Sequence, residues 1–156
     1  MKRYFLLFGL LIILFSACTK TSFNADKQAT IDDTKIQAYI AANHLTVTKT
    51  ASGLYYQILQ TNPGPHPIAS DTVQISLTGT LLNATVFDTE TVQNFQISEL
   101  VPGVQEGVQL IGANGDVPYG RILLIMPSRL GYGTTATGSI PSNAVLVFKV
   151  DLIGFF

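Results

Sequence analysis

Tyr132 lies between Gly131 and Gly133 in the loop that joins two apolar segments of the chain, 121–126 and 144–152. A phenol hydroxyl can donate a hydrogen bond to a carbonyl oxygen, and loops held on a rigid sheet often carry the binding groups of proteins. A tyrosine flanked by glycines has no evident packing role in the sequence. Tyr132 is therefore the first candidate for a binding residue, and a purely structural tyrosine is the alternative.

The other residue types that carry chemistry are sparse and scattered. No Gly-x-Ser-x-Gly sequence is present, and neither His44 nor His66 stands in a recognisable catalytic triad. One cysteine and two histidines, far apart along the chain, do not predict a metal site, and the glycines after residue 111 are too widely spaced to hold a phosphate. We therefore expect no metal, no cofactor, and a function that needs neither a nucleophile nor an acid–base pair.

Charge and length exclude further classes of function. The chain has 9 basic and 10 acidic residues and a formal net charge of -1, without the basic stripe that would neutralise phosphates. Nucleic acid is therefore excluded as a partner. With 156 residues and 47% hydrophobic content, the chain can bury one core, which predicts one folded domain.

The N-terminus has the layout of an export signal. Lys2 and Arg3 precede an apolar segment, residues 4–15, which is too short for a stable membrane span. Ser16-Ala17-Cys18 follows and resembles the bacterial lipobox, which implies cleavage before Cys18 and lipidation of its thiol. Residues 1–17 would then be a lipoprotein signal peptide, and the protein would face the periplasm from the outer membrane through a lipid anchor. An ordinary cleaved signal peptide and an uncleaved anchor are the alternatives.

A tether and a helix are expected next. Residues 18–26 lack apolar periodicity and predict a flexible tether. Apolar residues at helical spacing predict an amphipathic helix over 27–43, inside an N-terminal extension of residues 27–51. Asp32 and Asp33 would lie near the positive end of that helix dipole.

Residues 52–156 are predicted to form one α+β domain. The segment 72–79 alternates apolar and polar side chains, which is typical of a strand buried on one face. The segment 144–152 is an apolar run and is expected to be another strand, in which Val145, Val147 and Lys149 alternate with Leu146, Phe148 and Val150. One short helix, for which Ser98 is a candidate N-cap, interrupts the strands.

Short motifs occur in a characteristic order from residue 52 to residue 153: Ser52-Gly53-Leu54-Tyr55-Tyr56, Asp71-Thr72-Val73, Thr78-Gly79, Val86-Phe87-Asp88, Phe95, Leu100-Val101-Pro102-Gly103, Glu106-Gly107, Pro127-Ser128, Leu130-Gly131-Tyr132-Gly133, Ile140-Pro141, Leu146-Val147-Phe148 and Val150-Asp151-Leu152. Together they resemble the FKBP-type peptidyl-prolyl cis/trans isomerases. The resemblance implies a twisted antiparallel sheet wrapped around one short helix, preceded here by the N-terminal helix, with an aromatic pocket between sheet and helix.

The resemblance also implies which residues form that pocket. The matching positions are Phe87, Asp88, Leu100, Val101, Val104, Tyr132, Ile140 and Phe148. By the same resemblance, the backbone N–H of Val101 and the hydroxyl of Tyr132 donate hydrogen bonds to the substrate. Val104 stands where the family usually has a tryptophan floor, and Leu77 where it usually has a strand tyrosine, so we expect a wider pocket.

Isomerisation of an X-Pro bond fits this sparse inventory of reactive groups. The partial double bond imposes a barrier of roughly 18–20 kcal/mol, and an apolar site that prefers the twisted amide would lower it. The resemblance therefore implies an isomerase that acts on proline-containing unfolded or exported polypeptides, and we expect it to be a monomer. A non-catalytic binding module of the same fold and a structural envelope lipoprotein are the alternatives.

Overall fold

The computed structural model describes residues 19–156, with side chains described from Asn24 onward. The predicted signal peptide and Cys18 lie outside the described residues. In chain order the elements are α1 (Thr19–Ala42), β1 (Thr48–Lys49), β2 (Tyr55–Gln60), β3 (Thr72–Leu81), β4 (Val86–Gln96), a 3-10 turn (Ile97–Glu99), α2 (Pro102–Val108), β5 (Gly120–Met126), a second 3-10 turn (Ser128–Leu130) and β6 (Leu146–Phe155).

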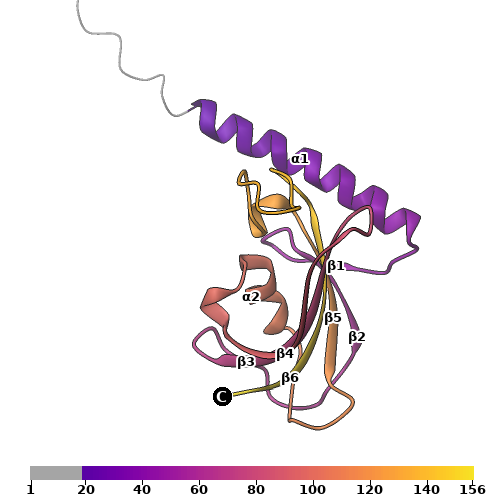
Figure 1. The fold of residues 1–156 in the computed structure, drawn as a ribbon. Coiled ribbons are helices and arrows are strands. Elements are labelled where there is room, and N and C mark those ends of the chain that lie inside the picture. Colours follow the sequence, from indigo (N-terminus) through magenta and orange to yellow (C-terminus); the bar gives the residue numbers. More distant parts are fainter. Residues whose placement is uncertain (1–18) are drawn as a thin grey trace, which may run out of the picture.

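The strands form one twisted sheet of six strands in the order β1-β2-β5-β6-β3-β4 (Figure 1). Every pairing in it is antiparallel. In β3 the side chains of Val73, Ile75 and Leu77 are buried, as their alternation with polar residues predicted. The predicted α+β fold, a twisted antiparallel sheet with one short helix and an N-terminal helix, is confirmed.

The end of β5 and the start of β6, the two central strands, are apolar on both faces of the sheet. On one face, Leu124 and Phe148 belong to the main core, which α2 covers with Val104 and Val108. On the other face, alternate residues of the same strands belong to a second apolar cluster. Because successive side chains of a strand point to opposite faces, this sheet needs a cover on each side.

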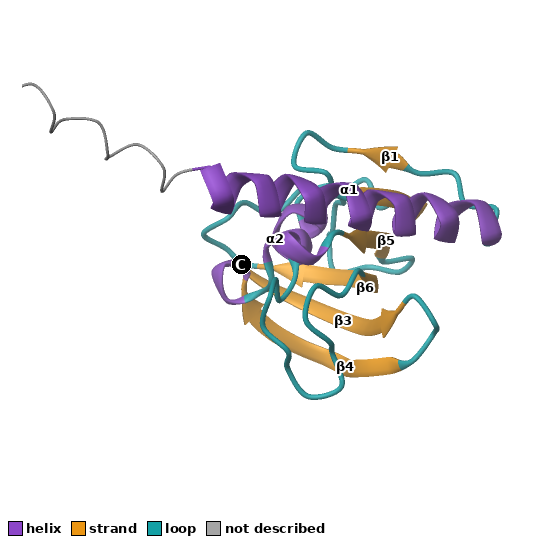
Figure 2. Ribbon diagram, turned by 90° about the horizontal axis from the view of Figure 1, so that it is seen from above, coloured by secondary structure: helices purple, strands orange, loops and turns teal. Residues whose placement is uncertain are grey.

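Helix α1 covers the second face, and Figure 2 shows it running along one side of the sheet. Its Ile36 is fully buried against Tyr55, Ile125, Val145 and Val147. Full burial of an isoleucine side chain stabilises a fold by about 1.5–3 kcal/mol. The N-terminal helix is therefore an integral part of the folded unit.

The helix starts earlier than the sequence pattern predicted. It begins at Thr19, so the segment expected to be a flexible tether, residues 18–26, is helical from Thr19 onward. The segment contains no glycine or proline that would end the helix. Its described side chains are exposed, so this part of the helix does not pack against the sheet and shows no apolar periodicity in the sequence. Within residues 19–156, no helix combines the length and the apolar character needed to cross a membrane.

Helix α2 lies unusually close to β5 because two of its residues are glycines. A Cβ atom on Gly103 would lie 2.7 Å from Met126 Sδ, and one on Gly107 would lie 2.5 Å from a Leu124 methyl group. Ser98 does not cap this helix. It belongs to the preceding 3-10 turn, and Val101 is the N-cap residue, followed by Pro102, whose missing N–H costs nothing in a first turn.

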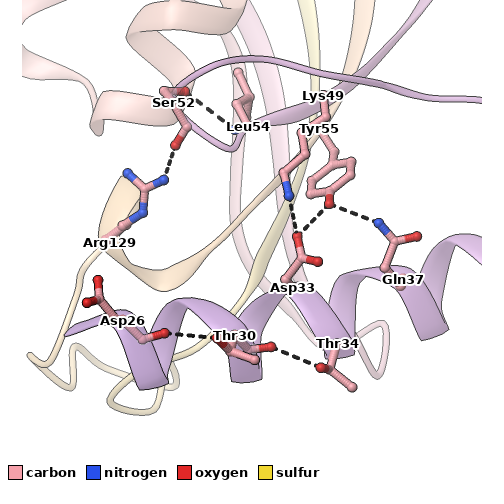
Figure 3. A network of polar contacts seen from close by, with 10 residues as sticks. All are labelled: Asp26, Thr30, Asp33, Thr34, Gln37, Lys49, Ser52, Leu54, Tyr55 and Arg129. Atoms are coloured by element: carbon pink, nitrogen blue, oxygen red, sulfur yellow. Dashed lines mark hydrogen bonds and ion pairs between the residues drawn. The ribbon is translucent and has the colours of Figure 1, made fainter. Parts of the chain in front are cut away.

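Polar contacts also hold α1 to the sheet (Figure 3). The Asp33 carboxylate accepts hydrogen bonds from Lys49 Nζ at 2.6 Å and from the Tyr55 hydroxyl at 2.5 Å. Gln37 donates to the same hydroxyl at 2.9 Å. The hydrogen bonds from Lys49 and Tyr55 hold the pKa of Asp33 below its ordinary value of 3.8.

Replacing Asp33 with asparagine should lower the free energy of unfolding at neutral pH by less than about 1 kcal/mol, because its side chain is 42% exposed and solvent screens the charge. The folded-state pKa lies below the unfolded one, so this contribution is fully present above about pH 4 and is lost as the pH falls through the folded value. Urea unfolding of both chains across that range would test this. A difference between the two chains that stays constant at acid pH would contradict it.

Candidate functional site

The predicted site residues come from four parts of the chain: β4 (Phe87, Asp88), the start of α2 (Leu100, Val101, Val104), the loop between β5 and β6 (Tyr132, Ile140) and β6 (Phe148). Val104, Ile140 and Phe148 are buried in the main core. The other apolar members are half-buried and pack against that same core. All the predicted apolar residues thus belong to the main core or pack against it, and we call this set the aromatic cluster, while their role in binding stays a prediction.

The centre of the aromatic cluster is an edge-to-face pair of rings. The centroids of Phe87 and Phe148 lie 5.4 Å apart, with ring planes at 83°, a favoured geometry for aromatic pairs. The two residues approach from the strands on either side of β3, and Gly79 of β3 pairs with both Phe148 and Asp88. A Cβ atom on Gly79 would lie 2.5 Å from Phe87 Cε2 and 2.8 Å from Phe148 Cε1. Gly79 therefore permits the ring pair, a role that the motif alone did not reveal.

The loop that carries Tyr132 is fixed by backbone hydrogen bonds at its base. The carbonyl of Ser128 accepts from the N–H of Gly131 at 3.0 Å and from that of Gly133 at 2.8 Å. Gly133 has φ +59°, the left-handed region that favours glycine. Its carbonyl in turn accepts from Asn143. Tyr132 is thus held between two residues that both bond to Ser128.

The hydroxyl of Tyr132 lies in an apolar and negatively charged environment. Burial raises the pKa of Tyr132, and the nearby Asp88 carboxylate raises that pKa further. Both effects act against the phenolate, because it loses hydration and is repelled by a like charge. At neutral pH, Tyr132 therefore keeps its proton and can donate a hydrogen bond.

Val104, where the sequence predicts a wider pocket, is buried and lines neither of two cavities found in residues 19–156. Its side chain is 1% exposed, and Leu77, at the other departure from the family, is also buried in the main core. Two cavities of about 340 and 440 Å³ lie elsewhere, the first beside Leu59 and Arg121 and the second between α1 and Arg129. The candidate site is therefore the half-buried surface of the aromatic cluster. Among residues 19–156, no group of three or more His, Cys, Asp or Glu side chains could hold a metal ion.

Sequence reasoning missed the role of Asp32. Because α1 begins at Thr19, Asp32 lies in mid-helix and does not act on the positive end of the helix dipole. Its carboxylate is buried and accepts hydrogen bonds from Ser128, at the base of the Tyr132 loop. A signal was present: Asp32 precedes the buried Ile36 by one helical turn, so it lies on the face that packs against the sheet.

Replacing Asp88 with asparagine should lower the pKa of Tyr132, because the negative charge that opposes the phenolate is removed. The pKa should remain above the ordinary tyrosine value, since burial, the larger cause, persists. NMR titration of the Tyr132 ring in both chains would measure the change. An unchanged or higher pKa in the variant would show that the two groups do not interact.

Comparison with known proteins agrees with this geometry. The sequence model of the FKBP-type peptidyl-prolyl cis-trans isomerase family matches residues 64–153. The chain is 40% identical to the FKBP-type peptidyl-prolyl cis-trans isomerase FkpA of Aeromonas hydrophila over 140 residues, 85% of this chain and 50% of that protein. It is 36% identical to the outer membrane protein MIP of Legionella longbeachae, over 86% of this chain and 58% of that protein.

A solved structure shares the fold as well. The crystal structure of FkpA from Escherichia coli superposes with a TM-score of 0.69 and 30% sequence identity, covering 86% of this chain and 63% of the other. The chain spans about half the length of the curated relatives it matches. Both its sequence, through most of the sheet and α2, and its arrangement of elements place the chain in the family of FKBP-type peptidyl-prolyl cis-trans isomerases.

Proposed function

We propose that the chain catalyses cis/trans isomerisation of X-Pro bonds in polypeptides. The observation that carries this proposal is the aromatic cluster, in which the Phe87–Phe148 ring pair and Tyr132 lie together in a member of this family. Uncatalysed isomerisation takes tens to hundreds of seconds, and each tenfold acceleration requires about 1.4 kcal/mol of preference for the transition state.

The half-buried rings supply part of that preference. In water, the planar amide is stabilised because its charge-separated resonance form is well hydrated. A prolyl ring against Phe87 and Tyr132 would exclude this water, and the twisted amide, with less charge separation, would lose less. The site then binds the transition state better than the planar ground state, which is the condition for catalysis.

Two hydrogen-bond donors can orient the substrate. The hydroxyl of Tyr132 can donate to a substrate carbonyl. Among the described residues, the N–H of Val101 makes no backbone hydrogen bond, although the carbonyl of Val101 accepts from Val104 and Gln105 at the start of α2. A donor without a backbone partner beside an apolar surface is suited to bind the carbonyl of an extended peptide.

We also place the protein in the bacterial cell envelope, where its substrates would be exported, proline-containing polypeptides. The relatives named FkpA and outer membrane protein MIP support an envelope or periplasmic location. The sequence Ser16-Ala17-Cys18, outside the described residues, supports a lipid anchor at Cys18 and attachment to the outer membrane. A monomeric state remains our expectation.

A non-catalytic binding module is the second candidate. It is favoured by the burial of Val104 and Leu77, since neither presents the aromatic side chain that is usual at these positions in the family. An aromatic contact contributes on the order of 1 kcal/mol beyond its buried area, so a missing floor could reduce turnover about tenfold. Such a module would bind proline peptides without enhancing their cis/trans exchange, which NMR exchange spectroscopy of the peptide detects.

The full chain, kept in mild detergent, should accelerate the proline-limited refolding of a model protein in proportion to its concentration. Tyr132→Phe should lower kcat/KM about threefold to tenfold, because one hydrogen bond to the substrate is lost. Tyr119→Phe is the matched control, since Tyr119 lines the cavity beside Leu59 and Arg121. A folded wild-type chain that refolds the substrate no faster than buffer would exclude catalysis and favour the binding module.

The anchor has its own test. In a Gram-negative host fed an alkyne-tagged fatty acid, the wild-type chain should carry the tag and sediment with the outer membrane. Cys18→Ser should remove the tag, because the thiol is the only one in the chain. A wild-type chain without the tag would indicate an ordinary signal peptide or an uncleaved anchor instead.

A further inference from the structure

Asp32 is a buried carboxylate that joins α1 to a segment far away in the sequence. The residue is 1% exposed. One of its oxygens, Oδ2, accepts from the backbone N–H of Ser128 at 2.9 Å and from the Ser128 hydroxyl at 2.6 Å, and the other accepts from Gln28 at 2.8 Å. Hydrogen bonds to an ionised acceptor are stronger than neutral ones, and a buried carboxylate is stable only when such donors satisfy it.

The partner of Asp32 is the residue that fixes the Tyr132 loop. Ser128 is the first residue of the 3-10 turn Ser128–Leu130. Its N–H and hydroxyl face Asp32, while its carbonyl accepts from Gly131 and Gly133 on either side of Tyr132. A shift of Ser128 would therefore move both backbone anchors of Tyr132. The position of α1 on the sheet and the position of the tyrosine ring are mechanically linked through one residue.

A second contact extends the link to α2. Arg129, next to Ser128, donates to the backbone carbonyl of Ser52 (Figure 3). The hydroxyl of Ser52 donates to Glu106 of α2 at 2.5 Å. The base of the loop is thus tied to α1 on one side and, through the turn before β2, to α2 on the other. The helix bearing Glu106 is the one whose N-terminus presents the N–H of Val101.

We propose that α1 is a positioning element of the isomerase site, and that Asp32 is the positioning residue through which it holds Ser128 and hence Tyr132 in the geometry that binds substrate. This inference rests on the proposed isomerase function. It assigns to the N-terminal helix a part in substrate binding by the domain, in addition to covering the sheet. Asp32 touches no substrate; it acts only through Ser128.

Asp33 provides a matched control on the same helix. It also ties α1 to the rest of the chain, but through Lys49 and Tyr55 of the sheet and not through the Tyr132 loop. Asp33→Asn therefore weakens the hold of α1 without altering Ser128. Asp32→Asn removes the charge that Ser128 binds, and Ser128→Ala removes the hydroxyl while keeping the backbone N–H bond to Asp32.

The experiment compares these three variants with the full wild-type chain at a temperature where circular dichroism shows all of them folded. The measurements are kcat/KM on a short proline peptide and hydrogen exchange of the Gly133 amide, which bonds to Ser128. Asp32→Asn and Ser128→Ala should lower kcat/KM about fivefold or more, because small misplacements of a binding group are costly. Both should speed exchange at Gly133, whereas Asp33→Asn should stay within about twofold of wild type in both measurements.

Two results would overturn the inference. If Asp33→Asn loses as much activity as Asp32→Asn, α1 merely stabilises the fold; if Asp32→Asn and Ser128→Ala match wild type, Ser128 does not position the loop. Should Asp32→Asn fail to fold, the result for Ser128→Ala decides whether Ser128 positions the loop. This variant keeps the hydrogen bond from the backbone N–H to Asp32 and so disturbs the fold less. An inactive wild-type chain would defeat the proposed function instead, and exchange at Gly133 would then decide alone whether α1 holds the loop.

Discussion

The central strands β5 and β6 bear apolar side chains on both faces along the half of the sheet that leads into the Tyr132 loop. Leu124 and Phe148 face α2, while Ile125 and Val147 face α1. Neither face can be left in water without losing the burial that stabilises the fold. Farther along the same strands the outer face becomes polar, with Arg121 and Asp151 paired across the sheet, and α1 does not cover it.

The position of the candidate site follows from the packing of α2 on one face of the sheet and of α1 on the other. Glycines bring α2 close to β5, so the short helix sits against the same core as the ring pair. The loop from β5 to β6 leaves the sheet between the two helices. Its base meets α1 through Asp32 and Ser128, while its tyrosine joins the aromatic cluster on the opposite face. The same loop therefore contacts α1 at its base and the core under α2 through its tyrosine. This is how α1, which lies outside the family's motifs, can influence the candidate site.

The departures from the family have a packing explanation. At the two positions where the family usually has an aromatic ring, this chain has smaller apolar side chains, and such side chains gain contacts when neighbours enclose them. Val104 and Leu77 are both buried. Side chains that remain half-buried, such as Phe87, Leu100 and Tyr132, lie over this core and would meet a substrate in the proposed function. Sequence comparison could identify the missing rings, but not whether the side chains in their place would be buried.

The sequence by itself determined the alternation of β3, the apolar run that becomes β6, and the motif order that identifies the family. These features are local, since a strand period or a Gly-Tyr-Gly loop is readable within a few residues. Only the tertiary structure decided that α1 covers the second face, that it extends back to Thr19, and that Asp32 meets Ser128. A period shows which side of a helix is buried, but the partner of a buried carboxylate depends on how distant elements pack.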